Sequence, residues 1–357
     1  MMMNLNLIDN NLHHRDEEMM QRALELASRG VGTTSPNPPV GAVIVKNGRI
    51  IGEGYHERAG EAHAERRALQ NAREQGNEAE LVGATIYVTL EPCSSYGRTP
   101  PCTEAILESG IGRVVYGATD PDKRHRGRAE ELLRAAGVEV TPGVAEAACR
   151  AFLRPWMHAV ETGMPWVVAK VATTLDGRIT RRHERWLSGK EALSYAHQLR
   201  VESDAILVGG NTVRCDKPAL TIRHPQRPAP ACKRQPRRIV LTRCRESLPA
   251  EAPLLADENA SETLVYENVE DLRELLAGLY SEYGVVRLLL ECGGRLLRSF
   301  MEQGLVNEWV QVVTPYLGGG GELALPGEWL PKEYHLTDAE TMQLGRDIVL
   351  RGRLTWS

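Results

Sequence analysis

The chain has 357 residues, of which 42% are hydrophobic and 25% are charged, and its formal net charge is −4. A chain of this length is too long to fold around one typical hydrophobic core, which predicts two domains. The composition is that of an ordinary globular protein. The small net charge gives no global basic field of the kind that attracts nucleic acid. No apolar run resembles a signal peptide or reaches the roughly 20 residues of a membrane span, so we expect a cytoplasmic protein without nucleic-acid or membrane partners.

The first half of the chain alternates predicted helices and strands. Helical spacing of apolar residues predicts a helix over 16–29, and the turn signal Asn47-Gly48 separates a strand over 40–45 from a return strand that begins at Ile50. Further helices are predicted over 63–72, 103–109 and 129–136, and further strands over 84–90, 113–117 and 138–140. Strands that alternate with helices indicate an α/β layer fold.

A second series of predicted strands and helices begins after the segment Glu161-Thr162-Gly163-Met164-Pro165. We place the domain boundary there, which gives domains of residues 1–160 and 161–357. The basic, proline-rich stretch 223–238 is interpreted as a surface loop. Strands are predicted over 166–171, 205–208, 238–242, 263–266, 285–290 and 309–313, and helices over 190–200 and 269–279.

Three residues of the first half have the pattern of a catalytic zinc site. His63-Ala64-Glu65 is followed by Pro92-Cys93 and then by Cys102. One imidazole and two thiolates occupy three of the four zinc positions and leave the fourth open for water. Because zinc lowers the pKa of a bound water, that water can lose a proton near neutral pH. Glu65 is not needed as a ligand and is the predicted catalytic proton carrier. Hydrolytic base deaminases share this arrangement.

Two alternative interpretations compete with a catalytic zinc site. The His63 imidazole and two of the seven cysteines would be unrelated core side chains, or they would hold a purely structural zinc. A structural zinc normally has a fourth protein ligand, and none is evident in the sequence. An odd number of cysteines also argues against a disulfide framework. The order of the ligands, the proline and the interposed glutamate therefore favour a deaminase.

With these motifs in hand, the chain resembles the bifunctional deaminase/reductase family of riboflavin biosynthesis. Unlike other base deaminases, it has eight residues between its two cysteines and a second domain. The resemblance rests on Thr34-Ser35-Pro36-Asn37-Pro38, Val40-Gly41, Gly52-Glu53-Gly54-Tyr55-His56, His63-Ala64-Glu65, Glu91-Pro92-Cys93 and Gly97-Arg98-Thr99-Pro100-Pro101-Cys102. It implies a cytidine-deaminase-like three-layer α/β/α domain and a homo-oligomer.

The resemblance also implies a substrate, a diaminopyrimidinone ribosyl phosphate, whose ring loses one amino group. The substrate-binding residues that it implies in the first domain are Asn37, His56, Arg98 and Asp120. An amide, an imidazole, a cation and a carboxylate suit a polar heterocycle that carries an anion. The chain departs from the family at two positions on the substrate side of the site, because Ser95 stands where the family usually has His and Asp122 where it usually has Asn.

The second domain resembles the family's reductase domain, which has a dihydrofolate-reductase-like α/β fold. Its motifs include Leu175-Asp176-Gly177-Arg178, Asp204-Ala205-Ile206-Leu207-Val208-Gly209 and Pro218-Ala219-Leu220-Thr221. Two predicted strands run into glycine turns, Gly209-Gly210 and Gly293-Gly294, where backbone N–H groups can approach a phosphate. Together with the resemblance, these turns favour NADPH as the cofactor, although the Rossmann pattern Gly-x-Gly-x-x-Gly is absent.

The resemblance assigns the reductase site residue by residue. The implied reaction delivers a hydride to the opened ribose and gives a ribityl chain. The cofactor-binding residues are Lys170, Ala172, Trp186, Thr212, Asp216, Gly293 and Gly294, and the substrate-binding residues are Arg200, Leu220, Arg223 and Glu291. The chain departs from the family at Glu184, which stands where a Ser would face the substrate, and at Lys217, which replaces an Asp.

The departures at Ser95, Asp122, Glu184 and Lys217 keep two alternatives open beside the full bifunctional enzyme. One is a paralogue that deaminates a related pyrimidine in a secondary-metabolite pathway. The other is an active deaminase whose reductase-like domain is catalytically silent and only binds a ligand or holds an oligomer together. Loss of NADPH in the presence of the deaminated product separates the full bifunctional enzyme from a deaminase with a silent reductase-like domain.

Overall fold

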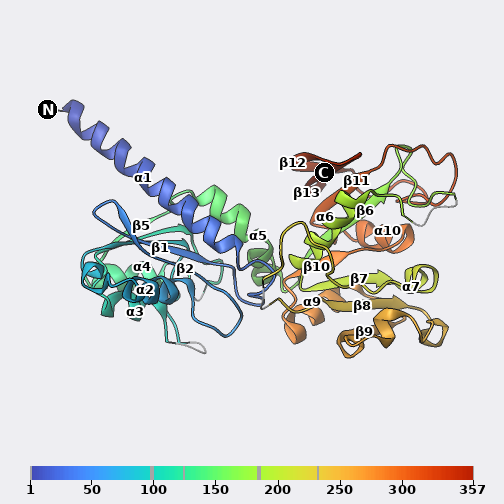
Figure 1. The fold of residues 1–357 in the computed structure, drawn as a ribbon, viewed down its shortest axis with the longest axis horizontal. Coiled ribbons are helices and arrows are strands. Elements are labelled where there is room, and N and C mark those ends of the chain that lie inside the picture. The colour runs from blue at the N-terminus through green and yellow to red at the C-terminus, as the bar shows by residue number, and fades with distance from the viewer. Residues whose placement is uncertain (1, 97–99, 124, 183–185, 231–232, 357) are drawn as a thin grey trace. The chain divides into compact units, whose positions relative to one another are not determined.

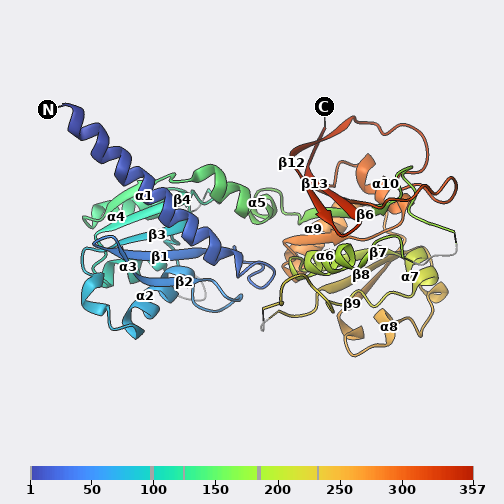
Figure 2. The ribbon, with the colours of Figure 1, turned by 45° about the horizontal axis from the view of Figure 1, so that its top comes forward.

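The computed structural model describes residues 2–96, 100–123, 125–182, 186–230 and 233–356. The chain divides into two compact units, Met1–Thr162 and Gly163–Ser357, and each is built around one β-sheet (Figures 1 and 2). None of the helices among the described residues combines the length and the apolar character of a membrane span.

The sheet of the first unit has five strands in the order β2-β1-β3-β4-β5. A hairpin pairs β1 with β2, β1 also pairs with β3 in an antiparallel sense, and β3, β4 and β5 are parallel. The strands are β1 Gly41–Lys46, β2 Arg49–Tyr55, β3 Thr85–Leu90, β4 Arg113–Ala118 and β5 Glu139–Pro142. Because β3 and β4 are parallel, the segments that follow them, which begin at Glu91 and Thr119, start at the same edge of the sheet.

Helices cover both faces of this sheet and form a three-layer α/β/α unit (Figure 1). Helices α1 and α5 pack on one face, where a side chain at Gly41 would collide with the backbone of α1 and one at Gly117 with Cys149 of α5. Helix α2 packs on the other face, against Gly52 and Gly54, and α3 and α4 follow it there. The helices are α1 Met2–Ser28, α2 Ala64–Glu74, α3 Cys102–Glu108, α4 Arg128–Ala135 and α5 Glu146–Thr162, with a 3-10 turn over Glu78–Leu81.

Every helix and strand predicted in the first half is present, with two differences. Helix α1 begins at Met2 rather than at residue 16, since no proline or glycine interrupts the chain before Gly30. Helix α5 was not predicted at all. It contains Pro155, a residue that normally ends or kinks a helix, and its apolar residues Leu153, Trp156 and Met157 are nevertheless buried.

The sheet of the second unit has eight strands in the order β12-β13-β11-β6-β10-β7-β8-β9. Strands β11, β6, β10, β7, β8 and β9 are parallel, and β12 and β13 are antiparallel additions beside β11. The strands are β6 Trp166–Thr173, β7 Ala205–Gly209, β8 Arg237–Thr242, β9 Thr263–Glu267, β10 Arg287–Leu290, β11 Glu308–Val313, β12 Tyr334–Leu344 and β13 Asp347–Trp356.

Two apolar layers sandwich this sheet. One contains Leu276 and Leu279 of α9 and Phe300 of α10, and the other contains Tyr195 of α6 and Leu254 of α8. The helices are α6 Lys190–Val201, α7 Gly210–Asp216, α8 Pro253–Ala256, α9 Leu272–Tyr283 and α10 Gly294–Glu302, with 3-10 turns over Arg245–Ser247 and Ala260–Glu262. The hairpin β12–β13 was not predicted, because its outer strand exposes most of its residues and shows no clean apolar alternation.

Candidate zinc centre and adjoining sites

The three predicted zinc ligands of the first unit lie together. The Nδ1 atom of His63 is 3.5 Å from the Cys93 sulfur and 3.4 Å from the Cys102 sulfur. All three donor atoms lie within 4.8 Å of one another. Two ligands at zinc–nitrogen and zinc–sulfur distances in a tetrahedron are about 3.6 Å apart, so this donor set fits a zinc ion.

The three ligands lie at or just beyond the ends of secondary-structure elements. His63 is the residue before the first turn of α2, Cys93 follows β3 by three residues, and Cys102 is the first residue of α3. The backbone N–H of Cys102 donates to the Cys93 sulfur at 3.2 Å. Hydrogen bonds with Cys102 and His63 lower the pKa of Cys93, which favours the thiolate that a zinc ion requires.

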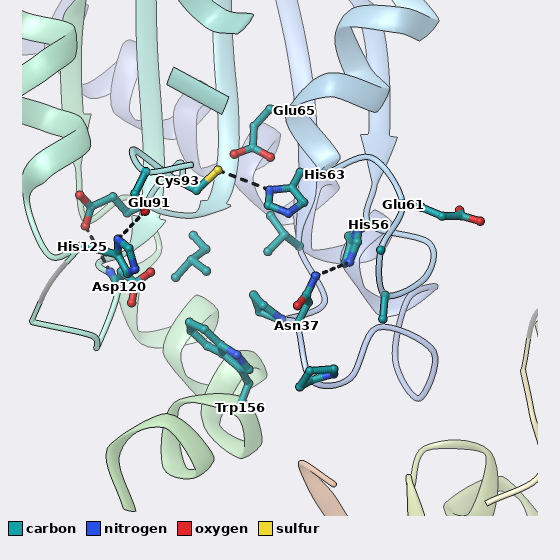
Figure 3. A pocket seen from close by; sticks show the side chains of 17 residues that line it. Asn37, His56, Glu61, His63, Glu65, Glu91, Cys93, Asp120, His125 and Trp156 are labelled. Carbon is teal, nitrogen blue, oxygen red and sulfur yellow. Dashed lines mark hydrogen bonds between the residues drawn. The ribbon is translucent and has the colours of Figure 1, made fainter. Parts of the chain in front are cut away.

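Glu65 lies in the first turn of α2 and is 3% exposed. Burial raises the pKa of its carboxyl group, and the neighbouring Cys93 raises it further. A carboxyl group with a raised pKa can both accept and return a proton near neutral pH. In Figure 3, its carboxylate lies beside Cys93 and His63 at the inner end of the pocket. This is where a proton carrier for a zinc-bound water is needed.

A pocket of about 390 Å³ adjoins this centre and is lined by His63, Glu65 and Cys93. Its volume is in the usual range for small-molecule sites. Of the residues that the family resemblance implies, it brings together Asn37, His56 and Asp120. Arg98 lies outside the described residues, so the structure gives no position for it.

Asn37 and His56 are linked in a fixed orientation. The Nδ1 atom of His56 lies 3.1 Å from the carbonyl oxygen of Ala62, and its Nε2 atom lies 3.2 Å from Nδ2 of Asn37. Burial lowers the pKa of His56, so the ring is neutral, donates from Nδ1 to Ala62 and accepts the Asn37 N–H at Nε2. The Asn37 side-chain oxygen is then the atom available to a ligand, as an acceptor for an N–H group.

Several residues of this pocket were missed by sequence reasoning. Trp156 comes from the unpredicted helix α5, and Glu61 and His125 lie in loops. Glu91 was noted only as part of a motif. Its buried carboxylate accepts the backbone N–H groups of Asp120, Gly127 and Ala129 at 3.1–3.3 Å. A glutamate directly after a strand, followed by Pro-Cys, is the one signal that would have pointed to this role.

In the second unit, most of the predicted reductase residues lie at one edge of the sheet, where β6, β7 and β10 have their carboxyl ends. Arg200 of α6 and Glu291, which follows β10, form two hydrogen bonds of 2.7 and 2.9 Å. Burial alone would raise the pKa of Glu291, but Arg200 and then Lys170 lower it to about 2. Lys170 is half-buried on β6, and its partial removal from solvent lowers its pKa. These three charged side chains, with Arg223 as a fourth, form one polar cluster inside the unit.

The segment that carries Leu220 and Arg223 is held against this cluster. Arg200 donates to the carbonyl oxygen of Thr221 at 3.0 Å, and the backbone N–H of Arg223 donates to Nδ1 of His197 at 3.2 Å. Leu220 is 3% exposed and has a φ of 53°. His197 was not singled out in the sequence, and burial lowers its pKa to about 4, so it is a neutral acceptor.

The predicted cofactor residues occupy the same edge. Ala172 lies on β6, Thr212 and Asp216 lie on α7, and Trp186 is 57% exposed in the loop before α6. Gly293 precedes α10, and no described atom lies within 4 Å of a side chain built there, so a bound group can approach this backbone and the first N–H groups of α10. At Gly294, a side chain would instead collide with the carbonyl oxygen of Leu323. This open turn fits a phosphate of a nicotinamide dinucleotide.

Comparison with known proteins gives matches in both halves. The model described as the cytidine and deoxycytidylate deaminase zinc-binding region matches residues 13–118, and the RibD C-terminal domain model matches residues 165–350. The riboflavin biosynthesis protein RibD of Aquifex aeolicus is 40% identical over 326 residues, which cover 86% of this chain and 88% of the relative. RibD of Escherichia coli is 35% identical over 94% of this chain and 98% of its own.

Solved structures match over the same length. RibD of Acinetobacter baumannii superposes with a TM-score of 0.87 and 35% identity over 96% of this chain and 99% of its own. A diaminohydroxyphosphoribosylaminopyrimidine deaminase/5-amino-6-(5-phosphoribosylamino)uracil reductase of Thermotoga maritima does so with a TM-score of 0.80 and 32% identity over the same shares. The predicted fold classes, deaminase-like in the first half and reductase-like in the second, are confirmed.

Proposed function

Because the chain belongs to the RibD family of bifunctional riboflavin-biosynthesis deaminase/reductases, we propose that residues 1–160 deaminate a diaminopyrimidinone ribosyl phosphate and that residues 161–357 then reduce its ribosyl chain. The chain is a zinc deaminase and an NADPH-dependent reductase that acts on a small pyrimidine. The observation that carries the first activity is the pairing of three zinc donors with the buried Glu65 at the inner end of a pocket.

In the deaminase, His63, Cys93 and Cys102 hold the zinc ion, which supplies a bound water that loses its proton easily. Glu65 takes that first proton and gives it to the ring nitrogen. It then carries the remaining proton of the added hydroxyl group to the departing amino group, so that one water is consumed and one ammonia is released. Its low exposure keeps bulk water from competing for the proton. The same buried position explains why its carboxyl group binds a proton more readily than an exposed one.

Asn37 orients the pyrimidine above this centre. Its side-chain oxygen, fixed by His56, accepts a hydrogen bond from a ring N–H or amino group of the substrate. Asp120 lies on the other side of the pocket in Figure 3 and provides a second acceptor. Burial raises the pKa of Asp120, which suits a carboxyl group that shares a proton with a polar ligand. We infer that the departing amino group faces Glu65.

In the reductase, NADPH supplies the hydride. Arg200 and Arg223 provide the positive charge for the substrate phosphate, and Glu291 holds Arg200 in place through two hydrogen bonds. Lys170 lies close enough to Glu291 to affect its pKa and can donate to the ribosyl oxygens. Ala172, Trp186, Thr212, Asp216, Gly293 and Gly294 are proposed to bind the cofactor, and Leu220 to contact the substrate.

Three of the four family departures can be placed in the structure. Lys217 forms an ion pair with Glu251 at the surface, and Ser95 lines the deaminase pocket. Asp122 lies in the loop after β4, and its backbone N–H is accepted by Asp120. Glu184 lies outside the described residues. We further propose a cytoplasmic homo-oligomer that binds neither nucleic acid nor membrane.

The proposed function is tested in one cuvette. Zinc-loaded protein receives the diaminopyrimidinone ribosyl phosphate, ammonia is measured, and NADPH is then added while its absorbance is followed. We expect ammonia first and loss of NADPH second. Ammonia without loss of NADPH would show a silent reductase domain. Absence of both, with zinc bound, would contradict the proposed substrate and favour a paralogue that acts on a related pyrimidine.

A further inference from the structure

The loop between β4 and α4 brings an unassigned imidazole to the deaminase pocket. His125 lines the pocket, and its Nδ1 atom is 3.1 Å from the hydroxyl oxygen of Ser95. Ser95 belongs to the insert between the two cysteine ligands and also lines the pocket. Two segments 30 residues apart therefore meet at one hydrogen bond. In Figure 3, His125 and Asp120 lie on the side of the pocket away from Asn37 and His56.

Hydrogen bonds to Glu91 hold both ends of the loop that carries His125. The carboxylate of Glu91, which is 4% exposed, accepts backbone N–H groups from Asp120 at the start of the loop and from Gly127 and Ala129 at its end. Within the loop, the N–H of His125 donates to the carbonyl oxygen of Asp122 at 2.9 Å. These hydrogen bonds hold the backbone of His125 and of both loop ends before a ligand arrives, which preorganises the His125 side chain for binding.

Among the described residues that line the pocket, His125 is the side chain suited to bind an anion. These lining residues include no Lys or Arg but do include Glu61, Glu65, Glu91 and Asp120. Of the other two lining histidines, His56 uses both ring nitrogens and His63 belongs to the zinc centre. The Nε2 atom of His125 has no hydrogen bond to any residue in the described ranges. The serine hydroxyl at Nδ1 can fix the tautomer that carries its proton at Nε2.

The surrounding sequence adds positive charge. Residues 120–129 contain four Lys or Arg residues besides His125 and only two Asp residues. Lys123, Arg126 and Arg128 are exposed at the surface of this loop. A basic loop at the rim of an otherwise acidic pocket attracts the negatively charged end of a ligand and not its ring. The sequence also has Ser95 where the family usually carries a histidine, so this chain presents the imidazole from the facing loop.

We propose that His125 is a substrate-binding residue of the deaminase, that Ser95 positions its ring, and that Nε2 donates a hydrogen bond to the phosphate of the substrate. This inference rests on the proposed deaminase function and adds the residue that recognises the anionic arm. The phosphate lies away from the ring carbon that reacts. A contact to it therefore stabilises the bound substrate and the transition state equally, which changes KM and leaves kcat unaltered.

The test uses the zinc-loaded full-length protein and two substrates, the diaminopyrimidinone ribosyl phosphate and the same riboside without phosphate. His125→Ala is expected to raise KM for the phosphorylated substrate about tenfold or more, with kcat within about twofold of the wild-type value. The kcat/KM for the riboside should not change. Ser95→Ala should act in the same direction with a smaller effect. Arg49→Ala removes an exposed charge at the start of β2, outside both the basic loop and the pocket lining, and should leave KM unchanged.

Rescue distinguishes a binding role from a structural one. Ser95→His in the His125→Ala background returns an imidazole to the same corner of the pocket and should lower KM again. Zinc content and the riboside activity report that each variant is folded. An unchanged KM for the phosphorylated substrate in His125→Ala, or an equal loss with both substrates, would overturn the inference. Wild-type protein that releases no ammonia from the phosphorylated substrate would instead overturn the proposed function itself.

Discussion

Arg200 and Glu291 form an ion pair with two hydrogen bonds, Nε to Oε1 at 2.7 Å and Nη2 to Oε2 at 2.9 Å. The two side chains are 11% and 13% exposed, and they join helix α6 to the turn after β10. The pair lies close to the half-buried Lys170, so Glu291 faces two positive charges. The Glu291 carboxylate thus fixes the position of the Arg200 guanidinium, which belongs to the proposed substrate phosphate site, before any ligand binds.

Glu291→Gln should destabilise the second unit in a pH-dependent way. The folded-state pKa of Glu291 is about 2, against an ordinary value of 4.5, so its contribution to stability is present above pH 4.5 and is lost as the pH falls toward 2. Removing one partner of a buried pair costs about 3 kcal/mol. Urea unfolding should show this difference from wild type at pH 7 and a steadily smaller one below pH 4.5.

The matched control is Glu262→Gln, which removes an exposed carboxylate that pairs with Arg237 on the same unit. That variant should unfold within about 1 kcal/mol of wild type at every pH, since exposed ion pairs contribute little. If Glu291→Gln were as stable as wild type at pH 7, the ion pair would not have the structural role that its geometry indicates.

His56 and Asn37 should behave as one functional unit. His56→Ala removes the acceptor that orients the Asn37 amide, so kcat/KM for deamination should fall roughly five- to tenfold, the worth of one hydrogen bond. Asn37→Ala should have at least as large an effect. If His56 acts through Asn37, the double variant will be no worse than Asn37→Ala alone. Additive losses in this double-mutant cycle would show that the two side chains contact the substrate independently.

Arg66 should stabilise the zinc site through the insert. Its guanidinium donates to the carbonyl oxygens of Pro100 and Pro101 at 3.2 and 3.3 Å, directly before the zinc ligand Cys102. Arg66→Ala should therefore speed the loss of zinc to a chelator by roughly tenfold, the typical effect of removing a group that orients a ligand. Zinc release is followed with a chromogenic chelator at neutral pH.

Arg73→Ala is the control for this experiment, because Arg73 lies on the same helix and pairs only with Glu78 among the described residues. Its zinc release should match that of wild type. A similar rate of zinc loss in Arg66→Ala and wild type would mean that the insert keeps Cys102 in place without help from α2.

The sequence was sufficient to predict the zinc centre and most of the fold. The motif His63-Ala64-Glu65 and the two cysteines lie at element ends, and ligand chemistry restricts what such residues can do together. The buried strands of both sheets were recognisable as short apolar runs, because central parallel strands bury both faces. Fold class and family follow from these features and were confirmed.

Other parts of the structure could not be predicted because they depend on distant contacts. The contact between His125 and Ser95 joins loops that neither periodicity nor spacing relates. The role of Glu91 depends on three backbone N–H groups that come from residues 120–129. Helix α5 forms although it contains Pro155, since burial of Leu153 and Trp156 outweighs the local preference. The residues of the reductase site other than its charged cluster still rest on family resemblance.

The central claim is that Glu65 carries protons at a zinc centre held by His63, Cys93 and Cys102. It is tested most directly by measuring zinc content and ammonia release in Glu65→Gln, with Glu108→Gln, an exposed position at the end of α3, as the control. We predict one zinc per chain in both variants, loss of ammonia release in Glu65→Gln by several orders of magnitude, and wild-type activity in Glu108→Gln. A near-normal rate of ammonia release from Glu65→Gln with zinc bound would contradict the account.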